Sequence, residues 1–108
     1  MISDMPPSIG AYFAADRLDG EAVSKCFTDD GRVNDEEHTY AGRDAIRRWK
    51  DETSAKYLFI SEPFAVAMEG SETVVTSRVT GDFPGSPIDL RYVFSLEGDR
   101  IAALEIAP

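Results

Sequence analysis

Two residues of the chain, Asp35 and His38, are of types that transfer protons in enzymes and lie three positions apart in the segment VNDEEH. A carboxyl group that is partly removed from water has a raised pKa and can act as a general acid or base. Imidazole titrates near neutrality without help, so His38 is either a second proton carrier or a partner that holds Asp35 in place. We name both as candidate catalytic residues. The alternatives are an aspartate that hydrogen-bonds local backbone and a solvated histidine.

Aromatic residues supply the candidates for the walls of a pocket. Large flat rings can surround a polycyclic apolar ligand, and the same rings can equally fill a closed core. We predict that Tyr12, Trp49 and Tyr92 line a pocket. The remaining large aromatic residues, which include Phe13, Tyr57, Phe59 and Phe64, are assigned to the core.

The first half of the chain predicts helices that would position these side chains. Prolines suit the first turn of a helix, and apolar residues then recur at helical spacing, which predicts a helix over residues 7–17. The segment DGEAVSKCF predicts a second, short helix that Asp19 can cap and that the turn TDDG ends. Cys26 in this segment is spaced for core packing, which is preferred over a role as nucleophile.

A brief strand over residues 33–35 and a loop that contains His38 are expected next. After the loop, RDAIRRWKDETSAKY predicts a third helix over residues 43–55. Its apolar stripe includes Trp49, whereas Lys50 falls outside this stripe. The third helix therefore brings the Trp49 ring to the wall of the expected pocket.

The second half of the chain changes to the period of strands. Four strand-length runs are separated by glycine-bearing turns, which predicts an antiparallel meander. In the third run Leu90 and Tyr92 alternate with Asp89 and Arg91, so that one face is apolar and the other mixed. Three helices packed on such a sheet are an α+β architecture.

Length and charge narrow the class of protein. The 108 residues suit one domain over residues 7–108, after a flexible N-terminus at residues 1–6. Eleven basic and twenty acidic residues give a net charge of −9, which disfavours nucleic acid and anionic membranes as partners. The start of the chain has no pattern of a secretory signal, so we expect a cytoplasmic protein. The single histidine, single cysteine and lack of a phosphate-binding loop predict no metal and no cofactor.

The order of these segments, and above all CFTDDGRVND followed by AGRDAIRRW, resembles the nuclear transport factor 2-like superfamily and its SnoaL-like polyketide cyclase group. The resemblance implies a cone, in which three N-terminal helices pack on a curved, mostly antiparallel sheet and enclose an apolar pocket. Isomerases, cyclases, hydrolases, dehydratases and non-catalytic binding modules share this fold, so the fold alone selects no reaction.

A more distant resemblance to ketosteroid isomerase rests on three residues. Tyr12 in YFAAD, Asp35 in VND and Asp89 in PID match by type that enzyme's tyrosine, its aspartate base and its protonated aspartic acid. Strict alternation, however, puts Asp89 on the face opposite Tyr92, pointing away from the pocket. The resemblance therefore supports Asp35, which the SnoaL-like cyclases also imply as a single acid for proton transfer.

Three functions stay open at this level. The first is a cofactor-independent cyclase, isomerase or hydrolase that transfers a proton at Asp35 on an apolar cyclic or carbonyl-bearing molecule. The second is a module that binds an apolar small molecule without changing it. The third is an interaction domain that forms a homodimer through the mixed sheet face, with Arg78, Arg91 and Val93 in contact with the partner.

Overall fold

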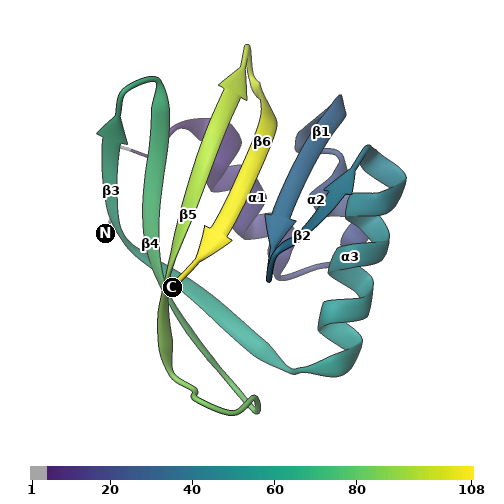
Figure 1. Cartoon of the computed structure of the whole chain (residues 1–108), viewed down its shortest axis with the longest axis vertical. Coiled ribbons are helices and arrows are strands. Elements are labelled where there is room, and N and C mark those ends of the chain that lie inside the picture. Colours follow the sequence, from purple (N-terminus) through teal and green to yellow (C-terminus); the bar gives the residue numbers. More distant parts are fainter. Residues whose placement is uncertain (1–4) are drawn as a thin grey trace.

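The computed structural model describes residues 5–108, in which three helices lie on one face of a six-stranded sheet (Figure 1). The helices are α1 (Pro7–Asp16), α2 (Gly20–Ser24) and α3 (Arg43–Lys56). The strands are β1 (Phe27–Asp35), β2 (His38–Ala41), β3 (Phe59–Glu69), β4 (Glu72–Gly81), β5 (Ile88–Glu97) and β6 (Arg100–Ala107). The predicted α+β class and the three predicted helices are confirmed.

The sheet is mixed, with the strand order β2-β1-β6-β5-β4-β3. All neighbouring pairs are antiparallel except β1 and β6, which run parallel. The predicted meander is confirmed as β3 to β6. The last strand of the meander, β6, lies in the middle of the sheet. Strands β1 and β2 extend the sheet on the side of β6 opposite β5.

The segment from Phe27 to Ala41 differs from the prediction, because it forms two strands where a turn, a brief strand and a loop were expected. TDDG does not end a helix but lies inside β1, with Asp29 and Asp30 exposed. The acidic residues are compatible with a strand since they face water, while Phe27 and Val33 are buried. The loop predicted around His38 is strand β2, which pairs with β1.

The helix ends follow local chemistry, and α3 is tied to both neighbouring elements. Asp19 caps α2 as predicted, because its carboxylate accepts a hydrogen bond from the Ala22 N–H at 2.9 Å. Gly20 donates its N–H to the Asp51 carboxylate at 2.8 Å, and a Cβ at Gly20 would collide with the backbone of α3. The Arg43 guanidinium donates two hydrogen bonds to the Phe27 carbonyl, at 3.1 and 2.7 Å. These bonds fix α3 relative to β1, which carries Asp35.

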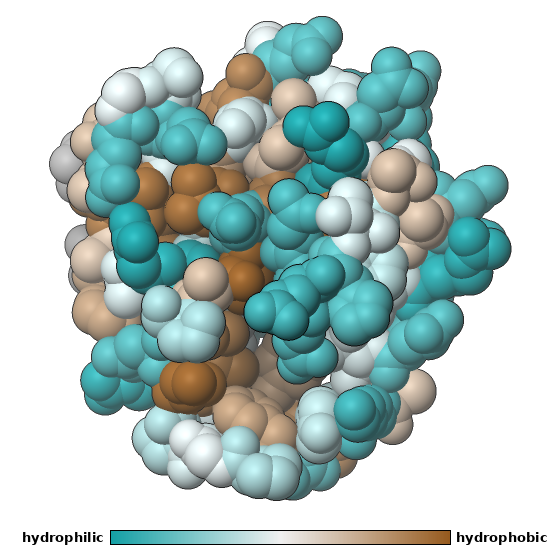
Figure 2. All heavy atoms as spheres, viewed as in Figure 1, coloured by the Kyte–Doolittle hydropathy of each residue, from teal (hydrophilic) through white to brown (hydrophobic). Residues whose placement is uncertain are grey.

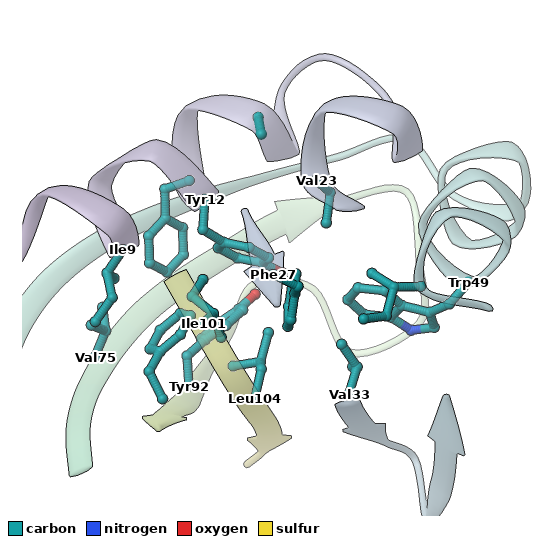
Figure 3. Close-up of a cluster of buried hydrophobic side chains, with 14 residues drawn as sticks. Ile9, Tyr12, Val23, Phe27, Val33, Trp49, Val75, Tyr92, Ile101 and Leu104 are labelled. Carbon is teal, nitrogen blue, oxygen red and sulfur yellow. The ribbon is translucent and has the colours of Figure 1, made fainter. Parts of the chain in front are cut away.

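The core lies between the helices and the sheet, where Tyr12, Phe27 and Phe94 are among its largest fully buried side chains (Figure 3). Tyr12 lies edge-on to Phe27 and to Phe94, with ring centroids 6.3 and 5.5 Å apart. Cys26 packs against this core as predicted, and burial raises the pKa of its thiol. Phe64 was assigned to the core wrongly, since it is 52% exposed on β3.

Two further expectations concern the chain ends and membranes. Residues 1–4 of the predicted flexible N-terminus lie outside the described residues. Between residues 5 and 108, no helix is both long and apolar enough to cross a membrane.

Candidate functional site

A cleft of about 740 Å³ lies between the helices and the inner face of the sheet. Figure 2 shows apolar surface in a hollow of the molecule with hydrophilic surface around it. The volume is in the range of sites for small ligands. Aromatic and aliphatic side chains make up most of the wall, and they include Tyr12, Trp49, Tyr57, Phe59, Phe83, Val79, Ile88, Leu90, Tyr92 and Ile106.

Asp35 lies in the wall of this cleft, at the last position of β1. One of its carboxylate oxygens, Oδ2, accepts a hydrogen bond from the Trp49 indole N–H of α3 at 3.0 Å. Trp49 itself is only 6% exposed, so the donor is held by packing in the core. The arrangement fixes the direction of the Asp35 carboxylate and places it on an apolar wall.

The surroundings of Asp35 shift its proton affinity. Burial raises the pKa of this carboxyl above its ordinary value, and the nearby Glu36 carboxylate adds to the rise. The hydrogen bond from Trp49 and the proximity of His38 act in the opposite direction, without cancelling the effect of burial. Asp35 thus has the electrostatic character expected of a general acid or base.

The turn that follows Asp35 is strained. Glu36 and Glu37 join β1 to β2 and both have positive φ, 51° and 67°. A two-residue hairpin needs this left-handed backbone, which Asn and Gly adopt far more easily than Glu. Both glutamates line the cleft beside Asp35. The two strained residues therefore lie at the rim of the candidate site. Backbone strain of this kind is typical of functional sites.

His38 is opposite Asp35 in the hairpin register but is exposed and is not among the residues that line the cleft. Its Nδ1 lies 2.9 Å from the carbonyl oxygen of Glu36, and its ring stacks on Tyr40. Since one ring nitrogen is engaged with the backbone of the strained turn, His38 is placed to hold the turn. The structure does not bring it into the cleft with Asp35.

Tyr12 and Tyr92 lie in the cleft wall together with Trp49, so all three residues predicted for the pocket line it. Burial strongly raises the pKa of the Tyr12 and Tyr92 hydroxyls, and the negative charges of Asp16 and Asp35 raise both further. The Tyr92 hydroxyl is also 3.2 Å from the Ser61 hydroxyl. The two phenols are therefore neutral groups that lie within electrostatic reach of two carboxylates, one from α1 and one from β1.

An ion pair in the same wall was missed by sequence reasoning. The Lys50 ammonium lies 2.9 Å from the Asp16 carboxylate, with side chains only 4% and 9% exposed, and 4.7 Å from the centre of the Phe59 ring. Lys50 was predicted to lie outside the apolar stripe of the third helix, and this prediction was wrong. The Lys50 side chain is buried and lines the cleft next to Trp49. The one available signal was that Asp16 follows Tyr12 by one helical turn.

Asp89 points away from the cleft, as the alternation of β5 predicted. It lies on the outer face of the sheet, where its carboxylate accepts hydrogen bonds from the Arg78 guanidinium at 2.9 and 3.3 Å. These bonds lower the pKa of Asp89. Tyr12, Asp35 and Asp89, which match residues of ketosteroid isomerase by type, therefore do not meet in one site. Tyr12 and Asp35 line the same cleft, and Asp89 does not.

Side chains that bind metals are not grouped in the described part of the chain. Among residues 5–108, no three His, Cys, Asp or Glu side chains cluster so that they could hold a metal ion.

Comparison with known proteins gives solved structures and no other matches. No family model matches this sequence. No curated protein matches it either. A candidate polyketide cyclase from Sinorhizobium meliloti is 37% identical, with 96% of each chain covered and a TM-score of 0.91.

More distant structures show the same fold. A protein from Catenulispora acidiphila with a ketosteroid isomerase-like fold, in complex with trimethylamine, is 20% identical. It has a TM-score of 0.83 over 96% of this chain and 87% of its own. SalBIII, an epoxide hydrolase/cyclase-like enzyme of pyran ring formation in salinomycin, is 19% identical. Its TM-score is 0.75, over 92% of this chain and 85% of its own.

The 37% identity over 96% of both chains assigns the family, and the more distant structures share the fold. The chain belongs to the nuclear transport factor 2-like superfamily, in a family of polyketide cyclase-like proteins.

Proposed function

We propose that this protein is a small cofactor-independent enzyme that transfers a proton at Asp35 on an apolar cyclic or carbonyl-bearing molecule. One observation carries the proposal: a carboxyl group with a raised pKa lies in the aromatic wall of a cleft large enough for a small ligand. The solved structures similar to this chain include a candidate polyketide cyclase and an epoxide hydrolase/cyclase-like enzyme. The activities in these names are consistent with chemistry on such molecules.

The proposed step uses the geometry of the Asp35 carboxylate. Oδ2 is held by the Trp49 indole, so Oδ1 is the oxygen that takes a proton from the carbon next to a substrate carbonyl. The electron pair of the broken C–H bond moves into the carbonyl and gives an enolate. Return of the proton to another position completes an isomerisation. In a cyclisation the enolate carbon attacks a second carbonyl, and the alkoxide that forms there takes the proton back from Asp35. Neither reaction changes the oxidation state or needs a co-reactant.

The test measures proton removal from a simple cyclic ketone that fits an aromatic cleft. We would incubate the protein with 2-tetralone in deuterium oxide and follow by proton NMR the loss of hydrogen next to the carbonyl. Asp35→Asn should slow the exchange by about 100-fold to 10,000-fold, the usual contribution of a general base. Asp89→Asn is the matched control and should exchange at the wild-type rate. Equal rates in wild type and Asp35→Asn would rule out the proposed step.

A second candidate function is binding without reaction, which the aromatic lining favours. Tyr12, Trp49 and Tyr92 would then set affinity and Asp35 would not. Because Trp49 is the only tryptophan of the chain, its fluorescence reports occupation of the cleft directly. Equal affinity of wild type and Asp35→Asn for 2-tetralone, together with no exchange in either, would favour this function.

We also propose that the protein forms a homodimer through the outer face of the sheet. A cytoplasmic location stays a prediction. The outer face exposes Phe64 beside Arg78, whose guanidinium lies 5.8 Å from the Phe64 ring. Arg91 is paired there with Glu69 at 3.1 Å, so both arginines already have partners within the chain. Sedimentation of wild type and Phe64→Glu tests the dimer, which would be refuted by a monomeric wild type.

A further inference from the structure

We propose that Lys50 is a second ligand contact beside Asp35 and donates a hydrogen bond to the carbonyl oxygen of the ligand on which Asp35 acts. The inference deepens the proposed function, on which it rests. It narrows the ligand to a molecule with an oxygen acceptor, since an ammonium group can donate and cannot accept.

The Lys50–Asp16 pair is placed for such a contact. Both residues line the cleft of Asp35, and both also line a smaller hollow of about 350 Å³. The pair therefore forms part of the wall of each and does not lie wholly in the closed core. It comes from the residue directly after Trp49, so one helix supplies both the partner of Asp35 and the proposed donor.

Lys50 retains donor capacity after its pairing with Asp16. An ammonium has three N–H groups. Asp16 lies 2.9 Å from Nζ, and the Phe59 ring covers another side of the group at 4.7 Å from its centre. The salt bridge holds the ammonium in place, and one N–H can turn toward an oxygen in the cleft.

Stability alone does not explain a buried ion pair in this position. Removing two charges from water is costly, and well-packed apolar residues of similar size often stabilise a protein as much or more. A fixed ammonium next to an apolar cleft has another use, since a preorganised donor stabilises negative charge that develops on oxygen during enolate formation.

The two polar contacts can reach one ligand. Lys50 and Asp35 line the same cleft, and the Tyr12 and Tyr92 rings belong to its wall as well. A ring that packs on these tyrosines can place its carbonyl toward Lys50 and the adjacent C–H toward Asp35.

The experiment compares 2-tetralone with tetralin, which has the same rings without the carbonyl. Isothermal titration calorimetry measures both affinities in wild type and in a double variant, Asp16→Leu with Lys50→Met, that replaces the whole pair by apolar side chains. Wild type should prefer the ketone by roughly tenfold or more, the usual strength of a hydrogen bond from a charged donor. The double variant should bind the two compounds almost equally.

Two controls separate this inference from the proposed function. Lys25→Met removes an exposed lysine, which lies 3.8 Å from Glu21, and should keep the preference for the ketone. Asp35→Asn should also keep the preference while it loses deuterium exchange. The infrared carbonyl stretch of bound 2-tetralone should be lowered in wild type and Asp35→Asn but not in the double variant.

The inference has clear contrary outcomes. It is overturned if wild type binds ketone and hydrocarbon equally or binds neither. It is also overturned if the double variant keeps both the preference and the lowered stretch. If deuterium exchange still depended on Asp35 in either case, the proposed function would hold and only the role of Lys50 would be refuted.

Discussion

Asp35 and Asp89 are two aspartates on the same sheet whose surroundings give them opposite character. Asp35 ends β1 on the inner face, partly buried in an aromatic wall, with its pKa raised. Asp89 lies near the start of β5 on the outer face, exposed and bound to Arg78, with its pKa lowered. Both stand in sequence contexts that resemble catalytic acids of ketosteroid isomerase, yet only one faces a cleft.

The contrast shows that the face of the sheet decides what a carboxyl group can do. Successive side chains of a strand point to opposite faces, so a shift of one position exchanges a desolvated site for a solvated one. The two ion pairs follow the same division, since Lys50–Asp16 is buried in the cleft wall and Arg78–Asp89 is exposed. Substitutions that change one face at a time test this division.

The largest difference is expected between the two ion pairs. Lys50→Met leaves the Asp16 carboxylate buried without its partner, which should cost about 3–5 kcal/mol in the free energy of unfolding. Arg78→Met breaks an exposed pair and should leave the free energy of unfolding almost unchanged. Urea unfolding measures both. Similar losses for the two variants would mean that the inner pair is accessible to water.

The strained turn beside Asp35 gives an intermediate effect of opposite sign. Replacing Glu36 with Asn and Glu37 with Gly fits the left-handed backbone and should stabilise the protein by about 1–2 kcal/mol. Chemical denaturation of the double variant checks this value. If the strain helps to aim Asp35, the same variant should lose part of its deuterium exchange, and an unchanged rate would assign the strain to no function.

The smallest effect is the pH dependence of stability at the two aspartates. The folded-state pKa of Asp35 is raised, so protonation stabilises the folded state at low pH and this contribution is lost as pH rises through that pKa. Asp35→Asn should therefore gain stability relative to wild type at neutral pH, and the gain should shrink toward about pH 4, near the unfolded value.

Asp89 should show the reverse dependence. Its pKa is lowered, so the carboxylate stabilises the folded state above its unfolded pKa and this contribution is lost as pH falls through the folded value. Asp89→Asn should be slightly less stable than wild type at neutral pH and equal to it in acid. Unfolding curves of both variants across this range would contradict the comparison if the two differences had the same sign.

Much of the fold could be predicted from the sequence because its signals are local. Apolar periodicity and proline at the first turn placed the helices, and glycine-bearing turns separated the four strands of the meander. The first strand was predicted only over residues 33–35 and the second was missed, because their signal is not local. Asp29 and Asp30 read as a turn, and they lie in an irregularity of β1, between the residues Phe27 and Arg32 that pair with the distant β6.

The candidate site divides in the same way. Alternation in β5 was sufficient to place Tyr92 inside and Asp89 outside, and Asp35 was indicated by its residue type and by the resemblance to ketosteroid isomerase and the SnoaL-like cyclases. The Lys50–Asp16 pair could not be predicted, because it joins two separate helices. A lysine normally keeps its charged end in water, whereas here both the aliphatic part and the ammonium of Lys50 are buried. The exposure of His38 depended on the turn at Glu36 and Glu37, whose residue types do not indicate a tight hairpin.

The most direct test of the account is the pKa of Asp35 in the ligand-free protein. Carbon-detected NMR titration of the carboxyl groups gives this value, with Asp35→Asn and Asp89→Asn to assign the two signals. We expect Asp35 to titrate above the ordinary value of an aspartate and Asp89 below it. An Asp35 pKa at or below that ordinary value would show a solvated scaffold residue and contradict its role as a general acid or base.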